Sequence, residues 1–168
     1  MRKDIRYAGI IGFCFMVVLV AFTIWGTTNR AVESGAATGE TVAIDTAGAE
    51  GIKEASKIVN SEGAVTGYTV VATQPGFYGS QITITLTYEQ DATTIKSVEI
   101  DASNETEGVG SKVAEEEFTS QFVGITTPVQ IADEGEGTKV DAVSQATVSS
   151  KAVAAGINKA SKFLQDNK

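Results

Sequence analysis

The residues best suited to do chemistry lie near the C-terminus, in the run of small and hydroxyl side chains at positions 141–150. Ser144, Thr147 and Ser149 offer hydroxyl groups that can donate hydrogen bonds or act as nucleophiles. The run follows a strand-like segment and precedes a long helical pattern, so backbone N–H groups and the positive end of a helix dipole are expected to converge there. This arrangement suits a phosphate group. From this run alone, the favoured interpretation is a helix N-terminus capped by Ser or Thr.

The order of residues in this run is more specific than a helix cap. Asp141, Ser144, Ala146 and Thr147 form an Asp-x-x-Ser-x-Ala-Thr sequence. It resembles the flavin attachment signature of the FMN-binding domains in the RnfG and NqrC subunits of membrane-bound redox pumps. In that family a flavin transferase joins the phosphate of FMN to the last threonine through a phosphoester bond. The resemblance implies covalent FMN at Thr147, with Ser144, Gln145 and Ala146 as neighbouring cofactor contacts.

One position departs from the family signature, because Gln145 stands where relatives usually have glycine. A glycine at this place permits a positive φ or a close approach of the flavin ring. The acceptor hydroxyl of Thr147 is nevertheless intact. We therefore expect the departure to affect local geometry more than attachment.

A second stretch, residues 104–112, contains a Gly-x-Gly loop between a predicted strand and a predicted helix. Alone, such a loop indicates a turn. It also resembles the Glu-Thr-Pro-Gly-Leu-Gly-x-Lys loop that packs against the flavin in the same family, with Glu107 replacing the proline. The resemblance implies cofactor contacts from Glu105, Thr106, Gly108, Val109, Gly110 and Lys112.

Individual roles follow from the chemistry of these side chains. If Thr147 carries FMN, Glu105 and Thr106 can bond polar edges of the isoalloxazine or ribityl chain. Lys112 or Lys139 can then balance the phosphate charge, although a lysine of this kind is more often an ordinary surface residue. Tyr78, in a turn after Pro75, can stack on the ring or simply cover the end of the sheet.

The elements that must position these motifs have readable periodicities. Residues 81–88 alternate polar and apolar side chains, which predicts a strand with Ile82, Ile84, Leu86 and Tyr88 buried. Together with residues 65–71 and 94–100 this predicts an antiparallel meander. Helical spacing predicts a short helix at 52–59, a helix at 113–123 and a final helix from about 147 to 164. The expected fold is α+β, with a mainly antiparallel sheet flanked by helices.

Two of these helices carry further expectations. Phe118 and Phe122 are spaced to face inward from the helix at 113–123, and with Gln121 they resemble the family's Phe-x-x-Gln-Phe pattern. The final helix is expected to bury one face, formed by Val153, Ile157, Ala160 and Leu164. A short strand is also expected at 129–132, followed by a solvated acidic turn.

Composition excludes several classes of function. The chain has no histidine and a single cysteine, Cys14, which argues against zinc fingers, His-ligated haem, iron–sulfur clusters and His-dependent hydrolases. The net charge is −8, with +3 in residues 1–30 and −11 in the remainder, so a nucleic acid partner is not expected. Any redox chemistry must therefore come from an organic cofactor.

The N-terminal segment predicts membrane attachment. Residues 7–29 carry no charge, which is long enough for a transmembrane helix. Arg2, Lys3 and Arg6 precede it, so the N-terminus is expected in the cytoplasm. The alternative is a cleaved signal peptide. Such a peptide normally has a shorter apolar core and ends in a small-x-small cleavage site, which the residues around Trp25 do not provide. The expected organisation is a membrane segment at 1–29, a linker at 30–49 and an extracytoplasmic FMN-binding domain at 50–168.

Taken together, the resemblance implies an electron-transfer protein with covalent FMN, acting within an Rnf-type ion-translocating ferredoxin:NAD oxidoreductase. Its partners would be the other subunits of that membrane complex and, for maturation, a flavin transferase. It would lack a complete catalytic site of its own and any metal site. Two alternatives stay open: a stand-alone membrane-anchored FMN carrier, and a non-redox membrane-anchored scaffold domain.

Overall fold

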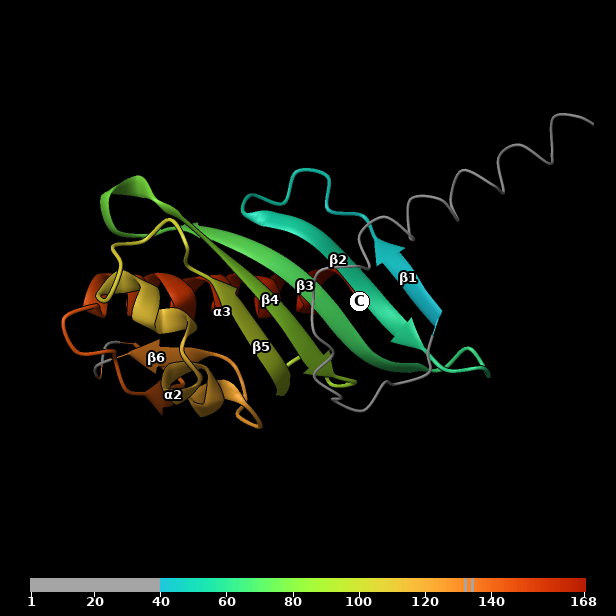
Figure 1. Cartoon of the computed structure of the whole chain (residues 1–168). Helices are drawn as coiled ribbons and strands as arrows, with labels where there is room; N and C mark the ends of the chain where they lie inside the picture. Colours follow the sequence, from blue (N-terminus) through green and yellow to red (C-terminus); the bar gives the residue numbers. More distant parts are fainter. Residues whose placement is uncertain (1–39, 132, 134) are drawn as a thin grey trace, which may run out of the picture. The chain divides into compact units, whose positions relative to one another are not determined.

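Five consecutive strands form one antiparallel sheet, arranged in the order in which they occur along the chain (Figure 1). The computed structural model describes residues 40–131, 133 and 135–168, within a compact unit that spans Thr38–Lys168. The predicted antiparallel meander is confirmed, and the sheet is wider than predicted. Its strands are β1 (Glu40–Ile44), β2 (Ile52–Val59), β3 (Val65–Pro75), β4 (Gln81–Glu89) and β5 (Ile95–Asp101).

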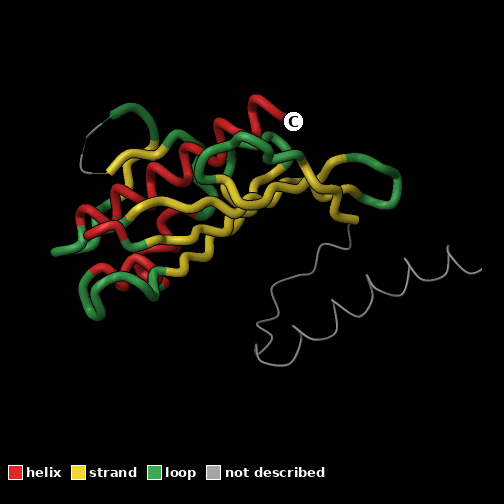
Figure 2. Tube along the Cα trace, turned by 90° about the horizontal axis from the view of Figure 1, so that it is seen from above, coloured by secondary structure: helices red, strands yellow, loops and turns green. Residues whose placement is uncertain are grey.

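The alternation in β4 divides the sheet into an inner and an outer face. Its apolar side chains, including Ile84 and Leu86, are completely buried, whereas the threonines between them are partly exposed. The last helix, α3 (Thr147–Asn167), packs on the inner face against β3 and β4 (Figures 1 and 2). The Tyr88 hydroxyl donates a hydrogen bond to the Ile157 carbonyl at 3.0 Å, which ties this strand to the helix.

The buried face predicted for the last helix is confirmed. Val153, Ile157, Ala160 and Leu164 are all fully buried against the sheet. Because burial of apolar surface contributes about 25 cal/mol per Å², this stripe stabilises the helix on the sheet. The helix therefore offers a fixed support for residues at its first turn.

The helix predicted at residues 52–59 is wrong, because this segment is strand β2. The buried residues Ile52 and Ala55 are three positions apart, a spacing that imitates a helix. A β-bulge between Ile52 and Glu54 inserts an extra residue, which brings both side chains to the same face of the strand. An irregular strand thus produced the helical spacing.

The continuous helix predicted at residues 113–123 is also wrong. The chain instead forms a 3-10 turn η2 (Gly110–Ala114), a short helix α2 (Glu116–Thr119) and a second 3-10 turn η3 (Ser120–Phe122). Glu115 breaks the path because its backbone is extended, with φ −75° and ψ 149°. The predicted inward aromatic pair is confirmed, since Phe118 and Phe122 are buried edge to face with ring centroids 5.0 Å apart.

Two short parallel strands connect this region to α3. They are β6 (Val129–Ile131) and β7 (Thr138–Val140). The Asn158 amide, on α3, exchanges two hydrogen bonds of 2.8 Å with the backbone N–H and carbonyl of Val129, which fixes β6 to the helix. Because β7 pairs with β6 and leads into residue 141, this contact also places the segment before α3.

The described residues cover only part of the N-terminal region for which a membrane segment and a linker were predicted. Residues 40–44, which were expected in the linker, form β1 and pair with β2. No helix within the described residues has the length and apolar character to cross a bilayer. The predicted transmembrane helix, at residues up to 29, lies outside them.

Candidate functional site

The two motifs meet at one cavity of about 310 Å³. Three segments line it: the turn after β3, the loop after β5 and the first turn of α3. The lining residues are Phe77, Glu105, Thr106, Val109, Gly110, Gln145, Ala146, Thr147, Val148 and Ser149. Seven of the eleven predicted site residues are thus brought together, although they come from stretches about 40 residues apart in sequence.

The first turn of α3 presents an open N-terminus to this cavity. Ala146 is the capping position, and no side chain among the described residues caps its amides. The predicted hydroxyl cap is therefore absent, and the first backbone N–H groups remain available to an anion. Thr147 is exposed, and its hydroxyl makes no hydrogen bond within the described residues.

The other hydroxyls of this turn, on Ser149 and Ser150, already form hydrogen bonds within the protein. Ser149 is 2% exposed and donates a hydrogen bond of 2.5 Å to the Glu105 carboxylate. Ser150 is fully buried, donates to the Ala146 carbonyl at 3.0 Å and accepts from the Val143 N–H at 3.0 Å. Among the hydroxyls at the start of α3, Thr147 is thus the one open to a ligand in the cavity.

Glu105 occupies the centre of the site rather than its surface. Its side chain is buried, and its Oε1 accepts hydrogen bonds from the Phe77 N–H at 3.1 Å and from the Ser80 hydroxyl. Its Oε2 accepts the bond from Ser149. The carboxylate thereby connects the turn after β3 with the first turn of α3.

The glycines of the second motif serve two different needs. Gly108 has φ +70°, a left-handed conformation that glycine adopts without strain, and open space lies where a side chain would project. A Cβ at Gly110 would instead collide with the Glu105 carboxylate. Gly108 therefore shapes the turn without lining the cavity, while Gly110 allows close packing.

Gln145 has φ +67°, a conformation that glycine adopts most readily and that few other residues adopt. The expectation that this position needs a positive φ is met by the backbone despite the glutamine side chain. The turn into α3 therefore adopts, with a glutamine, a left-handed conformation that is locally strained for a residue with a side chain.

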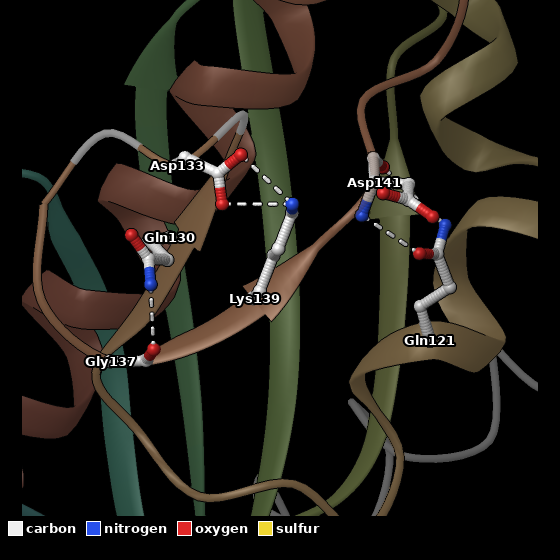
Figure 3. Close-up of polar contacts among 6 residues, drawn as sticks. All are labelled: Gln121, Gln130, Asp133, Gly137, Lys139 and Asp141. Atoms are coloured by element: carbon white, nitrogen blue, oxygen red, sulfur yellow. Dashed lines mark hydrogen bonds and ion pairs between the residues drawn. The ribbon is translucent and has the colours of Figure 1, made fainter.

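Two predicted contacts, Lys112 and Ser144, lie in a second cavity of about 520 Å³ instead. At this cavity the side-chain oxygen of Gln121 accepts a hydrogen bond of 3.0 Å from the backbone N–H of Asp141 (Figure 3). This contact joins the Phe-x-x-Gln-Phe segment to the start of the attachment motif. Lys112 thus lines a different cavity from the one that Thr147 lines.

Lys139 is occupied elsewhere and lines neither cavity. Its ammonium group forms an ion pair with Asp133, with Nζ–Oδ distances of 2.8 and 2.9 Å (Figure 3). The hydrogen bond and the charge of Asp133 raise the pKa of Lys139. A role for Lys139 in balancing a phosphate in the smaller cavity has no support from this geometry.

Tyr78 is 93% exposed, has φ 55° and does not line the cavity. Its neighbour Phe77 does, and the two rings pack with centroids 4.1 Å apart. Sequence reasoning missed Phe77 and Val148, which are both exposed apolar side chains at the cavity. The signal for Phe77 was its place beside Tyr78 in the same aromatic turn.

Comparisons with known proteins give a family match across this site. Residues 78–162 match the family described as "FMN-binding domain". The chain is 34% identical over 111 residues to the G subunit of the ion-translocating oxidoreductase complex of Methanosarcina acetivorans, a match that covers 64% of this chain. The same match covers 56% of that relative, so the chain spans little more than half of its length.

Solved structures show a shared fold. The C subunit of the Na⁺-translocating NADH-quinone reductase from Parabacteroides distasonis superposes with a TM-score of 0.54 at 21% identity, covering 67% of this chain and 62% of its own. NqrC of Shewanella oneidensis gives 0.53 at 22%, covering 68% and 61%. The family match spans half of the chain and includes both motifs that line the cavity. The chain belongs to the FMN-binding domain family.

Proposed function

We propose that the chain carries FMN covalently, through a phosphoester bond between the cofactor's phosphate and the Thr147 hydroxyl. The observation that carries the proposal is the exposed Thr147 hydroxyl on the cavity where both motifs meet. Ser149, two residues later, is buried and already bonded, so it is a poor acceptor.

The residues of the cavity fit such a group. The uncapped N-terminus of a 21-residue helix offers backbone donors and a favourable dipole for the phosphate. Phe77, Val109 and Val148 supply apolar surface for a ring system, and the volume of about 310 Å³ lies at the lower end of the range for small-molecule sites. When bound, FMN supplies transfer of one or two electrons. The protein's part is to hold and orient it.

We further propose that the chain is the electron-transfer component of an Rnf-type ion-translocating complex, working with other membrane subunits. The support is its 34% sequence identity, over 111 residues, to a protein named as the G subunit of an ion-translocating oxidoreductase complex. A stand-alone FMN carrier is the second candidate, and co-purification with polytopic membrane subunits separates the two. A purely structural scaffold is disfavoured because both motifs converge on one cavity.

The proposed location is a membrane-anchored protein with its acidic C-terminal domain outside the cytoplasm. The support is the uncharged run at residues 7–29 preceded by Arg2, Lys3 and Arg6. Protease added to intact, wall-stripped cells should remove the domain and leave a small N-terminal fragment. Full protection of residues 31–168 would contradict this topology.

The attachment site is tested by Thr147→Ala in the full chain, produced together with a flavin transferase. Wild type should give a fluorescent band on a denaturing gel and gain the mass of FMN less one water. Thr147→Ala should be dark, because it lacks the only oxygen proposed to form the ester. Its fold should persist, since no cap hydrogen bond is lost.

Thr106→Ala is the matched control. Thr106 is the other exposed threonine on the cavity, and its loss should leave the covalent label in place. Covalent flavin on Thr147→Ala, or label lost only from Thr106→Ala, would show that the attachment site is wrong. A wild-type chain that never accepts flavin from an active transferase would refute the flavin proposal itself.

A further inference from the structure

We propose that Glu105 is a positioning residue: its buried carboxylate holds the first turn of α3 against the turn after β3, and so fixes the orientation of the group attached at Thr147. The inference rests on the proposed function of Thr147. It assigns Glu105 a role through the protein, in place of the direct contact with the flavin that the sequence suggests.

The contacts of the carboxylate support this role. Three donors reach it: the Phe77 N–H at 3.1 Å, the Ser80 hydroxyl, and the Ser149 hydroxyl at 2.5 Å. A carboxylate has roughly four acceptor positions, so most of its capacity is used within the protein. Little remains for a ligand, although the residue lines the cavity.

The surrounding backbone is built to make room for this side chain. A Cβ at Gly76 would collide with Glu105 Oε1, and a Cβ at Gly110 would collide with Oε2. Glycine is thus required at two positions, one in each flanking loop, for the carboxylate to reach its donors. Both loops and the helix are therefore fitted around Glu105.

The consequence for Thr147 is geometric. Ser149 and Thr147 lie in the same first turn of α3, so a bond that fixes Ser149 also fixes the backbone that carries Thr147. The other end of the tie is the turn that places Phe77 at the cavity. Glu105 thus sets the separation between Thr147, where the group is attached, and the Phe77 ring at the cavity.

The chain offers a closely matched pair of variants for the test. Ser149 and Ser161 are both on α3, are each 2% exposed and both use their hydroxyls in buried hydrogen bonds. Only Ser149 bonds to Glu105; Ser161 bonds to Thr127, to the Ala92 carbonyl and to the Gln165 amide, away from the cavity. Because Ser161 has more partners, Ser161→Ala should cost at least as much stability as Ser149→Ala, yet only Ser149→Ala should change the site.

The full chain is labelled by a flavin transferase, occupancy is measured by mass spectrometry, and the order of the bound flavin is measured by visible circular dichroism and fluorescence anisotropy. Ser149→Ala and Glu105→Ala should lose much of the visible dichroism and lower the anisotropy. Ser161→Ala should match wild type. Glu105→Gln should retain most of the signal, because its amide oxygen can accept from Phe77 and its amide nitrogen can donate to the Ser149 hydroxyl.

Equal effects of Ser149→Ala and Ser161→Ala would overturn the proposal, as would a wild-type spectrum from Glu105→Ala or a Glu105→Gln signal as low as that of Glu105→Ala. Hydrogen exchange of the unlabelled chain gives a readout without flavin. The peptide covering residues 145–150 should exchange faster in Ser149→Ala than in Ser161→Ala. Failure of labelling in wild type, with this exchange difference present, would instead refute the flavin attachment and leave the tie intact.

Discussion

Gly110→Ala is the sharpest test of how the site is packed. The added methyl group would collide with Oε2 of Glu105 and lie 3.0 Å from the Ser149 hydroxyl oxygen. Neither neighbour can move cheaply, because Glu105 is buried and bonded to two other segments. The expected response is that the carboxylate swings away from Ser149.

The cost can be estimated from the bond that is lost. A hydrogen bond to a charged group contributes about 1.5–3 kcal/mol, and the Ser149 hydroxyl would be left buried without a partner. The lower chain entropy of alanine in the unfolded state offsets about 0.4–1 kcal/mol. The free energy of unfolding should therefore fall by about 2 kcal/mol.

Gly108→Ala provides the control, because open space surrounds this position and only its φ of +70° opposes a side chain. The left-handed conformation should cost about 1–2 kcal/mol in an L residue. This penalty is independent of Glu105. The two glycines thus separate a backbone penalty from a collision with one named side chain.

The assay is urea unfolding of the purified full chain, followed by far-ultraviolet circular dichroism, in a double-mutant cycle with Glu105→Ala. The Gly110→Ala penalty should shrink clearly when Glu105 is already alanine, whereas the Gly108→Ala penalty should stay the same. If both penalties are unaffected by Glu105→Ala, the collision is not the cause and the packing argument fails.

Two further predictions concern single residues. Gln145→Gly should leave the free energy of unfolding unchanged or raise it by up to about 1 kcal/mol, because glycine relieves the strain of φ +67°. Gln145→Val should lower the free energy of unfolding. The midpoints of urea unfolding distinguish the two variants. Burial alone would raise the pKa of Asp91, but hydrogen bonds from Thr94 and Thr93 outweigh it and lower this pKa to about 2. Because the pKa of Asp91 in the folded chain lies below its ordinary 3.8, ionised Asp91 stabilises the fold above pH 3.8, and this stabilisation is lost as the pH falls toward 2. The difference in the free energy of unfolding between wild type and Asp91→Asn should therefore shrink between these pH values. The change should stay below about 1 kcal/mol, since Asp91 is exposed.

The elements that the sequence predicted well are those with an unbroken period. Strand β4 alternates strictly, and α3 keeps one apolar face from Val153 to Leu164, so each periodicity identifies its element. Strand β2 was misread because its bulge changes the spacing of Ile52 and Ala55. A bulge is fixed by pairing with a neighbouring strand, which a local pattern cannot reveal.

The site was predictable to the level of which loops meet, but not of how they are joined. The family resemblance pointed to both motifs, and in the folded chain both motifs line one cavity. The bond between Glu105 and Ser149 links residues 44 positions apart, and its third segment, at Phe77 and Ser80, carried no motif. Only the folded chain shows that the carboxylate is enclosed.

The different surroundings of Thr147 and Ser149 follow from the rotation of α3 about its axis. Two positions along a helix correspond to a rotation of about 200°, so residues at this spacing point to nearly opposite sides. The predicted apolar face continues back to Ser149, four positions before Val153, so the sequence already places Ser149 toward the protein and Thr147 away from it. The buried stripe of α3 and the carboxylate of Glu105 settle the rotation of the helix: Ser149 turns inward to donate to Glu105, and Thr147 turns outward to the cavity. The chemistry proposed for Thr147 thus depends on the packing of side chains that lie on the opposite face of its helix.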